Sequence, residues 1–555
     1  MNNDTLNALL TISIDGPSVN DLDFESAVLK ILNHAGIGVS SRNVWRVIKD
    51  NADITRSAAI PREAVWSYDN VNILVKVQQI RKGGRRCDLS AADLLPSKED
   101  ITRLRQRLGD HITKLLSEEF KSFSSHRKPP PVQKAVTPST YMPLELMGEN
   151  EAVTSANIVI LRRFAKEANM TPENCWDQEV IGDQATCKNV RAAKRHRQDD
   201  VDNLERLSWA KECPGDFHFL WETGKCIHIA HWNSPKNVGS LAHLRDVVDR
   251  RNVDSGGKKF NAMDEFLHHA CKAHLIAALL HHLGMTCPGE DVPERSAEEL
   301  NDTIHSFLDK YVFKRTVRDS VDDSIFQHAV ALLRHLMLYV DLRQCIRHED
   351  GPGIISHWKF WLPTFLGTGR SQYSSEAANH LANLLADWSP RTTEVLTNNR
   401  GVNTHSREGH GKPVDMLVEH YNKILKKVLK ASGGQLTLRH AQEVSLAVPL
   451  LDEARRFCDR VFQAKQTVQH TTPSSHADVE AMWKSILEGS AYSPTPGRRL
   501  CSGKEFVDVV KKGDKRITVD RWLDNFLRKG KVDDETEHNT GDEDLEVDLA
   551  ALIDE

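Results

Sequence analysis

The stretch CWDQEVIGDQATCKNVRAAKRHR, residues 175–197, decides the fold that we expect for this chain. Its first half predicts a buried strand, and Gly182 and Asp183 mark the sharp turn at which the strand ends. The residues after Asp183 have helical spacing and include a cluster of basic side chains. We therefore expect a strand, a turn and a basic helix, with the carboxylate of Asp183 at the carboxyl end of the strand.

Two further acids complete a pattern that is typical of metal-dependent phosphoryl transfer. Residues 64–89 read as a strand that ends at Asp69, followed by a hairpin with a Gly-Gly turn, and residues 415–431 read as a helix that carries Glu419. Carboxylates from separate strands and a helix can hold two divalent ions. We expect Asp69, Asp183 and Glu419 to be the catalytic acids and the ligands of Mg²⁺ or Mn²⁺, with Asp415 as a substitute for Glu419. The alternative is that each aspartate is a turn former or a helix cap and that Glu419 is an ordinary exposed residue.

A second constellation lies in residues 212–232, where Cys213, Asp216 and His218 are close in sequence. It is compatible with a local metal or proton-transfer site, but we favour a capped turn with a buried histidine. His420, next to Glu419, is a further candidate. The histidines between residues 268 and 282 do not share one helix face, so we expect them to be structural or exposed.

Basic residues suggest two contacts with DNA. The helix after Asp183 could touch phosphates, carry a nuclear localisation signal or present a solvated face; its basic residues are Lys188, Arg191, Lys194, Arg195 and Arg197. Residues 24–52 read as helix, turn, helix, and Arg42 and Arg46 would share one face of the second helix. DNA-binding helix-turn-helix units have this form, as do short helical pairs without a partner, which we favour.

Composition excludes several classes of protein. The 555 residues are too many for one ordinary hydrophobic core. The sequence contains no run of about 18 apolar residues, so we expect no membrane partner. Ten cysteines without a CxxC pair favour reduced thiols, and with no signal peptide we expect an intracellular protein, nuclear or cytoplasmic. No phosphate-binding loop, dinucleotide fingerprint, nucleophile elbow or zinc-finger spacing is present.

Changes in pattern along the chain predict five regions. These are an N-terminal helical region (1–60), a core (61–260) with a helical and Pro-rich insertion near 96–140, an all-helical insertion (261–400), C-terminal helices that complete the core (401–470), and a polar region with an acidic disordered tail (471–555). The tail interleaves acids with Leu, Val and Ile and could fold on a protein partner or simply aid solubility.

Five segments in order resemble the domain-of-unknown-function family 6589, which occurs in fungi and animals, often in transposon-rich settings. They are WSYDNVN (66–72), VIGDQATCKNVRAAKRHR (180–197), PGDFHFLWE (214–222), ISHWKFWLPTFLGTGRSQYSSEAANHL (355–381) and RGVNTHSREGHGKPVDMLVEHYNKILK (400–426). The resemblance covers the chain from about Phe24 to Phe462. The family has no established activity, so the resemblance implies membership of the family but does not indicate which reaction, if any, the chain catalyses.

A second resemblance links VIGDQ and CPGDFHFLWE to cut-and-paste transposases of the hAT type. It implies an α+β, mostly helical chain with a ribonuclease-H-like α/β core interrupted by a large all-α insertion. Asp69 and Asp183 would be the first two metal ligands, Glu419 the third, and Cys213 and His218 the Cys-and-His pair. The chain departs from the pattern because Gln184 follows the acid and Asp216 precedes the histidine.

Together these features lead to one expected function and two alternatives. We expect a DDE-type transposase or nuclease relative that cleaves or joins DNA phosphodiesters with Mg²⁺ or Mn²⁺ and can act as a homo-oligomer. The opening residues lack the upstream DNA-binding domain of a full transposase, which favours a truncated or domesticated copy. The alternatives are a catalytically inactive DNA- or chromatin-binding protein and a protein-interaction scaffold that uses the acidic tail.

Overall fold

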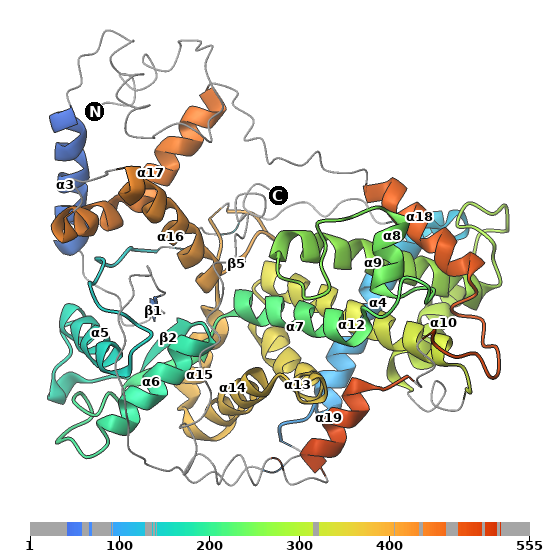
Figure 1. Cartoon of the computed structure of the whole chain (residues 1–555), viewed down its shortest axis with the longest axis horizontal. Coiled ribbons are helices and arrows are strands. Elements are labelled where there is room, and N and C mark those ends of the chain that lie inside the picture. The colour runs from blue at the N-terminus through green and yellow to red at the C-terminus, as the bar shows by residue number, and fades with distance from the viewer. Residues whose placement is uncertain are drawn as a thin grey trace. The chain divides into compact units, whose positions relative to one another are not determined.

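The computed structural model of the chain (Figure 1) describes most of its residues. The described residues are 41–57, 66–68, 90, 93–127, 136, 139, 141–314, 321–404, 406–431, 437–461, 475–501, 506–518 and 522. Asp69 and the predicted hairpin, the first helix of the N-terminal pair and the acidic tail lie outside them. The chain forms two compact units. Unit 1 comprises Met1–Arg81, Pro138–Cys213 and Val414–Thr471, and unit 2 comprises Lys82–Thr137, Pro214–Pro413 and Thr472–Glu555.

Unit 1 combines a small sheet with helices. Its elements are α3 (Ser41–Ser57), β1 (Trp66–Ser67), α5 (Thr154–Glu167), η3 (Pro172–Asn174), β2 (Gln178–Gly182), α6 (Gln184–His196), β3 (Ala210–Pro214), α16 (Val414–Ala431) and α17 (Leu438–Val461). The strands lie in the order β1-β2-β3, with β2 in the centre. All five residues of β2 are buried, as expected for this strand, and they include the polar Gln178 and Glu179.

The core of unit 1 forms where the sheet meets α5. Trp66 of β1 contacts Phe164 of α5 edge to face, with ring centroids 5.5 Å apart, and packs in the same way against Trp209, 5.7 Å away. Trp209 lies directly before β3, so one aromatic cluster joins the two outer strands and α5. The expected strand, turn and basic helix are confirmed as β2 and α6.

A second cluster in unit 1 joins α16 to α17. Leu425 of α16 packs with Val444 and Val448 of α17. The amide of Asn51 in α3 donates to the carbonyl oxygen of Leu446 at 3.3 Å, which ties α3 to the same helix. The helix expected at residues 40–52 is thus confirmed as α3, with its buried Ile48 facing inward.

Unit 2 is almost entirely helical. Its elements are α4 (Lys98–Glu119), η2 (Lys121–His126), α7 (Asp216–His231), α8 (Leu241–Val247), α9 (Phe260–Leu283), α10 (Ala297–Leu308), η4 (Asp309–Phe313), α12 (Ser324–Arg347), α13 (Gly351–Thr368), α14 (Ser371–Ala382), η5 (Asn383–Asp387), α15 (Pro390–Asn398), β4 (Gly401–Val402), β5 (Lys412–Pro413), α18 (Ser475–Glu488) and α19 (Val509–Thr518). The strands β4 and β5 pair antiparallel. The segment after residue 212, for which the sequence left helix and strand open, is β3 followed by α7.

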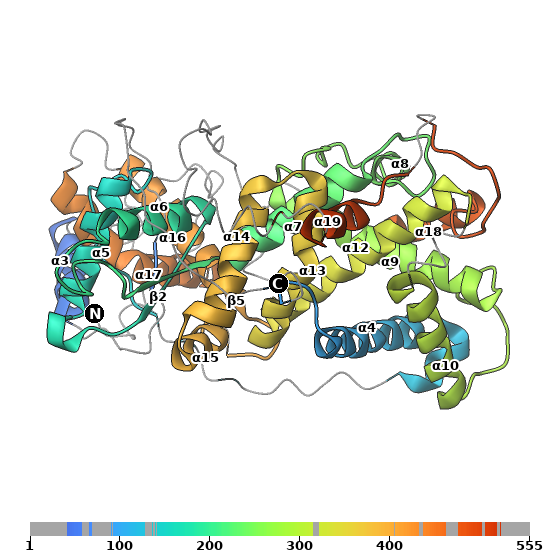
Figure 2. The ribbon, with the colours of Figure 1, turned by 90° about the horizontal axis from the view of Figure 1, so that it is seen from below.

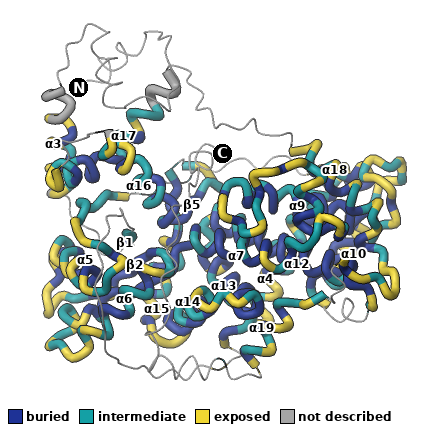
Figure 3. The backbone as a smooth tube through the Cα atoms, viewed as in Figure 1, coloured by how far each residue is buried: buried dark blue, intermediate teal, exposed yellow. Residues whose placement is uncertain are grey.

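The centre of unit 2 is formed by α12, which is buried on all sides, and by α9 (Figure 3). Most residues of both helices are buried, because neighbouring helices cover most of their surface, although Lys272 of α9 remains 41% exposed. Three buried histidines meet here: Nδ1 of His231 lies 3.3 Å from Nε2 of His328, and Nε2 of His231 lies 2.9 Å from Nδ1 of His335. Histidines are therefore part of the packed interior.

The helix α19 packs directly against α13 (Figure 2), and the backbones of the two helices come very close together. A Cβ added to Gly513 of α19 would lie 1.8 Å from the carbonyl oxygen of Pro363, and one added to Gly367 of α13 would lie 1.8 Å from that of Val509. Both positions therefore require glycine.

The expected fold class, α+β and mostly helical, is confirmed at this coarse level. In the part of the chain that the structure describes, we find no helix with the length and apolar character needed to span a bilayer.

Candidate functional site

Asp183 lies where the sequence predicted, directly after β2, and it is the N-cap of α6. Its Oδ1 atom accepts a hydrogen bond of 2.6 Å from the backbone N–H of Thr186. The side chain is half-buried. The cap holds one carboxylate oxygen in place, and a carboxylate has further lone pairs on its second oxygen.

The strand that precedes Asp183 pairs with β1, the strand that precedes the first predicted acid in the sequence. The strands β1 and β2 are parallel, with Trp66 opposite Val180 and Ser67 opposite Ile181. Asp69 itself lies outside the described residues. In the sequence it stands two positions after Ser67, just as Asp183 stands two positions after Ile181.

The third predicted acid comes from α16, which packs against both β1 and β2. Asp415 and Glu419 are one helical turn apart and so share a face of this helix. Asp415 is buried and Glu419 is half-buried. The structure thus brings the helix that carries both candidates to β1 and to β2, the strand that Asp183 directly follows.

Tyr68 directly follows β1 and is held by a hydrogen bond. Its hydroxyl donates to Oδ1 of Asn157 at 2.7 Å. Burial, with smaller contributions from nearby acidic side chains that include Asp183, raises the pKa of Tyr68 well above its usual value. Tyr68 therefore stays neutral at physiological pH.

The basic helix α6 uses part of its charge inside unit 1. Lys194, only 11% exposed, donates to Glu212 and to the carbonyl oxygen of Ala210. Arg197 pairs with Glu205 at 2.8 Å. These two predicted phosphate contacts therefore have structural partners within unit 1.

The other predicted phosphate contacts vary in exposure. Lys188, Arg191 and Arg195 are half-buried, and Arg46 of α3 is exposed. The side chain of Arg42 lies outside the described residues.

Of the Cys213, Asp216 and His218 constellation, Cys213 lies in β3, and Asp216 and His218 lie in the first turn of α7. Asp216 does not cap α7, whose N-cap is Gly215. Its carboxylate binds Arg400 through two hydrogen bonds, from Nε at 2.9 Å and from a terminal nitrogen at 2.5 Å, and both side chains are 3% exposed. His218 is half-buried. The favoured capped turn with a buried histidine is thus replaced by a buried ion pair and a half-buried histidine.

His420 has a structural partner. Its Nε2 lies 3.3 Å from Oδ2 of Asp452 on α17, and both residues are buried. Burial would raise the pKa of Asp452, but His420 and the neighbouring arginines hold it well below its usual value. We therefore assign His420 to the contact between α16 and α17.

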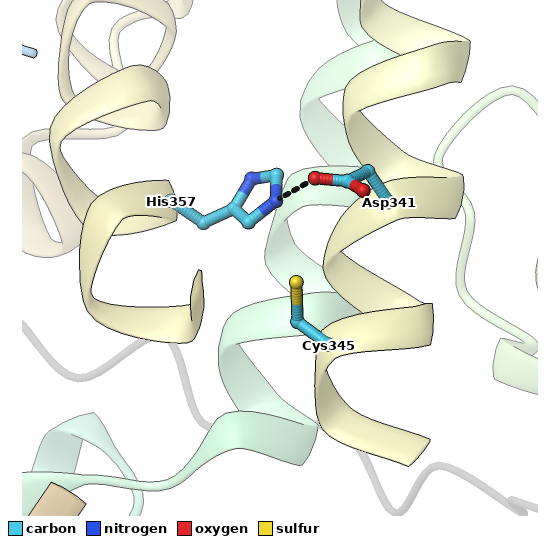
Figure 4. A group of neighbouring side chains, drawn as sticks. All are labelled: Asp341, Cys345 and His357. Atoms are coloured by element: carbon cyan, nitrogen blue, oxygen red, sulfur yellow. Dashed lines mark hydrogen bonds and ion pairs between the residues drawn. The ribbon is translucent and has the colours of Figure 1, made fainter. Parts of the chain in front are cut away.

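Sequence reasoning missed a cluster inside unit 2 (Figure 4). Asp341 and Cys345 are one turn apart on α12, and His357 of α13 donates from Nε2 to Asp341 at 2.9 Å. One donor atom from each residue lies within 4.8 Å of the others, and all three side chains are buried. An acid and a thiol at i and i+4 in an apolar helix, with a histidine early in the next helix, was the signal that could have found it.

The comparisons with known proteins give a family and no relative. The model of a family of unknown function, DUF6589, matches residues 83–470. Neither the curated proteins nor the solved structures gave a match to the chain.

Proposed function

We propose that this chain, which belongs to the DUF6589 family of unknown function, is a DDE-type nuclease or transposase relative that acts on DNA phosphodiesters. The observation that carries the proposal is the parallel pairing of β1 with β2. Parallel strands end at the same edge of a sheet, so acids placed equally far beyond paired residues are expected near one another. Asp69 and Asp183 stand in that relation.

The order of elements in unit 1 supports a ribonuclease-H-like core. A strand that precedes Asp69 is followed by α5, by β2 with Asp183, by α6 and by β3. The chain then leaves unit 1 at Cys213 and returns at Val414 with α16, which packs on β1 and β2. We propose Glu419 of this helix as the third acid, with Asp415 as its substitute.

The donor groups fit Mg²⁺ or Mn²⁺, because both ions prefer carboxylate oxygens. When bound, such ions would supply an activated water or 3′-hydroxyl and neutralise charge on the scissile phosphate. Asp183 would hold one ion with the carboxylate oxygen that does not cap α6. Its cap to Thr186 keeps that carboxylate in one orientation.

The test is divalent-ion-dependent cleavage of DNA by the intact chain and by Asp183→Asn. Asparagine is as good an N-cap as aspartate, so the variant keeps α6 capped and removes only the charge. Asp202→Asn is the matched control in the same unit, since Oδ1 of Asp202 accepts from the backbone N–H of Glu205 at 2.9 Å in the same i to i+3 pattern.

We expect cleavage with Mg²⁺ or Mn²⁺ by the intact chain and by Asp202→Asn, and a loss of at least about a hundredfold in Asp183→Asn, the loss typical of removing one group that stabilises a transition state. Equal activity of Asp183→Asn and the intact chain would remove Asp183 from the mechanism. Salt-sensitive DNA binding without any cleavage by the intact chain would overturn the catalytic proposal in favour of a DNA-binding role.

A further inference from the structure

We propose that Asp341, Cys345 and His357 form a zinc site inside unit 2. The three side chains come from adjacent helices, two from α12 and one from α13, and point toward one another (Figure 4). Their donor atoms already lie within 4.8 Å of one another, so small side-chain movements would bring them around one ion. This proposal does not depend on the acids of unit 1.

The donor set selects the metal. A thiolate, an imidazole and a carboxylate are the ligands that Zn²⁺ takes in proteins, whereas Mg²⁺ takes oxygen ligands. Helix spacing also suits the site, since Asp341 and Cys345 are at i and i+4 and face the same side of α12. The cluster therefore differs in metal preference from the carboxylates proposed for unit 1.

Neighbouring residues hold the carboxylate in position. Arg107 of α4 donates from Nε to both oxygens of Asp341, at 3.1 and 2.9 Å. His357 also donates to this carboxylate, at 2.9 Å, so Asp341 is held from α4 and from α13. With further lone pairs on its two oxygens, the carboxylate can keep Arg107 as an outer partner while it binds the ion.

His111 of α4 lies beside the carboxylate of Asp341, outside the set of three donor atoms that lie within 4.8 Å of one another. Nε2 of His111 is 3.5 Å from Oδ1 of Asp341, and the His111 side chain is 29% exposed. Zinc sites are commonly tetrahedral, and His111 or a water would complete four ligands. Because His111 is the one partly exposed member of this set, it also marks the side from which an ion would enter.

Glycine makes room for the thiol. A Cβ added to Gly353 of α13 would lie 2.7 Å from Sγ of Cys345 and 2.2 Å from a carboxylate oxygen of Asp350. Any side chain at this position would push the sulfur out of the cluster. The first turn of α13 is thus shaped around Sγ of Cys345.

Proton balance is straightforward. On binding, Cys345 would lose its thiol proton to solvent and bind through sulfur. The Nε2 proton of His357 that now bonds to Asp341 would leave Nε2, and a proton on Nδ1 would give the neutral tautomer that binds metal through Nε2.

The experiment measures zinc itself. The intact chain is stripped with a chelator, refilled with Zn²⁺ or with Co²⁺ as a spectroscopic substitute, desalted and analysed for metal content and for the thiolate-to-cobalt charge-transfer absorption. The variants are Cys345→Ser and His357→Gln. The control is Cys271→Ser, which changes a buried thiol of α9 outside the cluster, and Asp183→Asn separates this site from the acids of unit 1.

We expect one zinc per chain and a thiolate-to-cobalt band in the intact chain, in Cys271→Ser and in Asp183→Asn. Cys345→Ser should lose the band, and both cluster variants should bind zinc at least about tenfold more weakly, since even outer-shell changes cost that much. An intact chain that retains no zinc, or gives no thiolate-to-cobalt band, overturns the proposal. This readout needs no variant, so it decides the matter even if a substitution in the cluster prevents folding.

Discussion

Replacing Gly513 by alanine should detach α19 from α13. The added Cβ would lie 1.8 Å from the carbonyl oxygen of Pro363 and 2.5 Å from its carbonyl carbon. Since Cβ atoms essentially never come closer than 3.0 Å to another atom, the helices would have to move apart by about 1.2 Å. The opposing group is backbone, so no side-chain rotation can relieve the contact.

The magnitude follows from what α19 buries. Val510 and Ile517 are 4% and 2% exposed, and complete burial of each such side chain contributes about 1.5–3 kcal/mol. Detachment therefore costs about 3–6 kcal/mol, of which alanine's better helix propensity offsets about 1 kcal/mol. We expect a net loss of about 2–5 kcal/mol in the free energy of unfolding of unit 2.

The assay is urea unfolding followed by tryptophan fluorescence, together with hydrogen exchange of the α19 amides. Gly109→Ala is the matched control, because Gly109 also lies inside a helix and its added Cβ would make an ordinary 3.5 Å contact with Ile304. That variant should gain up to about 1 kcal/mol. If Gly513→Ala is as stable as the intact chain and its α19 amides are equally protected, the close crossing does not hold α19. The match to the family model ends at residue 470, before α19 begins, so this experiment tests a contact with a helix outside the matched residues.

Three further predictions concern buried charges and histidines. Burial lowers the pKa of three histidines of unit 2, to about 4 for His228, about 3 for His274 and about 4 for His328. The histidines of the unfolded chain bind protons near pH 6.5, whereas the buried histidines of the folded chain stay neutral there. The free energy of unfolding should therefore be full above pH 6.5 and fall below it, by on the order of 2 kcal/mol per histidine at pH 5. A urea midpoint that is equal at pH 7.5 and pH 5 would contradict this. Asp216→Ala leaves Arg400 buried without its carboxylate and should lower the stability measured by thermal unfolding by about 3–5 kcal/mol. Adding Arg400→Leu should restore part of this loss. A double variant that is no more stable than Asp216→Ala would argue against the ion pair as the cause. Lys194→Met should lower the free energy of unfolding of unit 1 by about 3 kcal/mol, because it leaves Glu212 without its lysine. The dependence of DNA affinity on salt concentration should not change. A weaker dependence on salt in the variant would instead indicate that Lys194 contacts a DNA phosphate.

The sequence by itself determined the local elements of this protein. Sequence patterns predicted β2, the turn at Gly182 and Asp183, the basic helix α6 and a helical region from residue 261, and the described residues contain all of these elements. It also placed Asp183 at the end of its strand. These features depend on residues within a few positions of one another, which is the range over which helix and strand periodicity acts.

Only the tertiary structure decided what the polar side chains do. The sequence indicated a basic helix at α6, but not that Lys194 would pair with Glu212 of a later strand. Asp216 finds its arginine 184 positions further along the chain. Asp341, Cys345 and His357 meet because α12 packs on α13. Periodicity shows which face of an element is buried, whereas the partner of a buried charge depends on which elements pack together, and a local pattern carries no information about that.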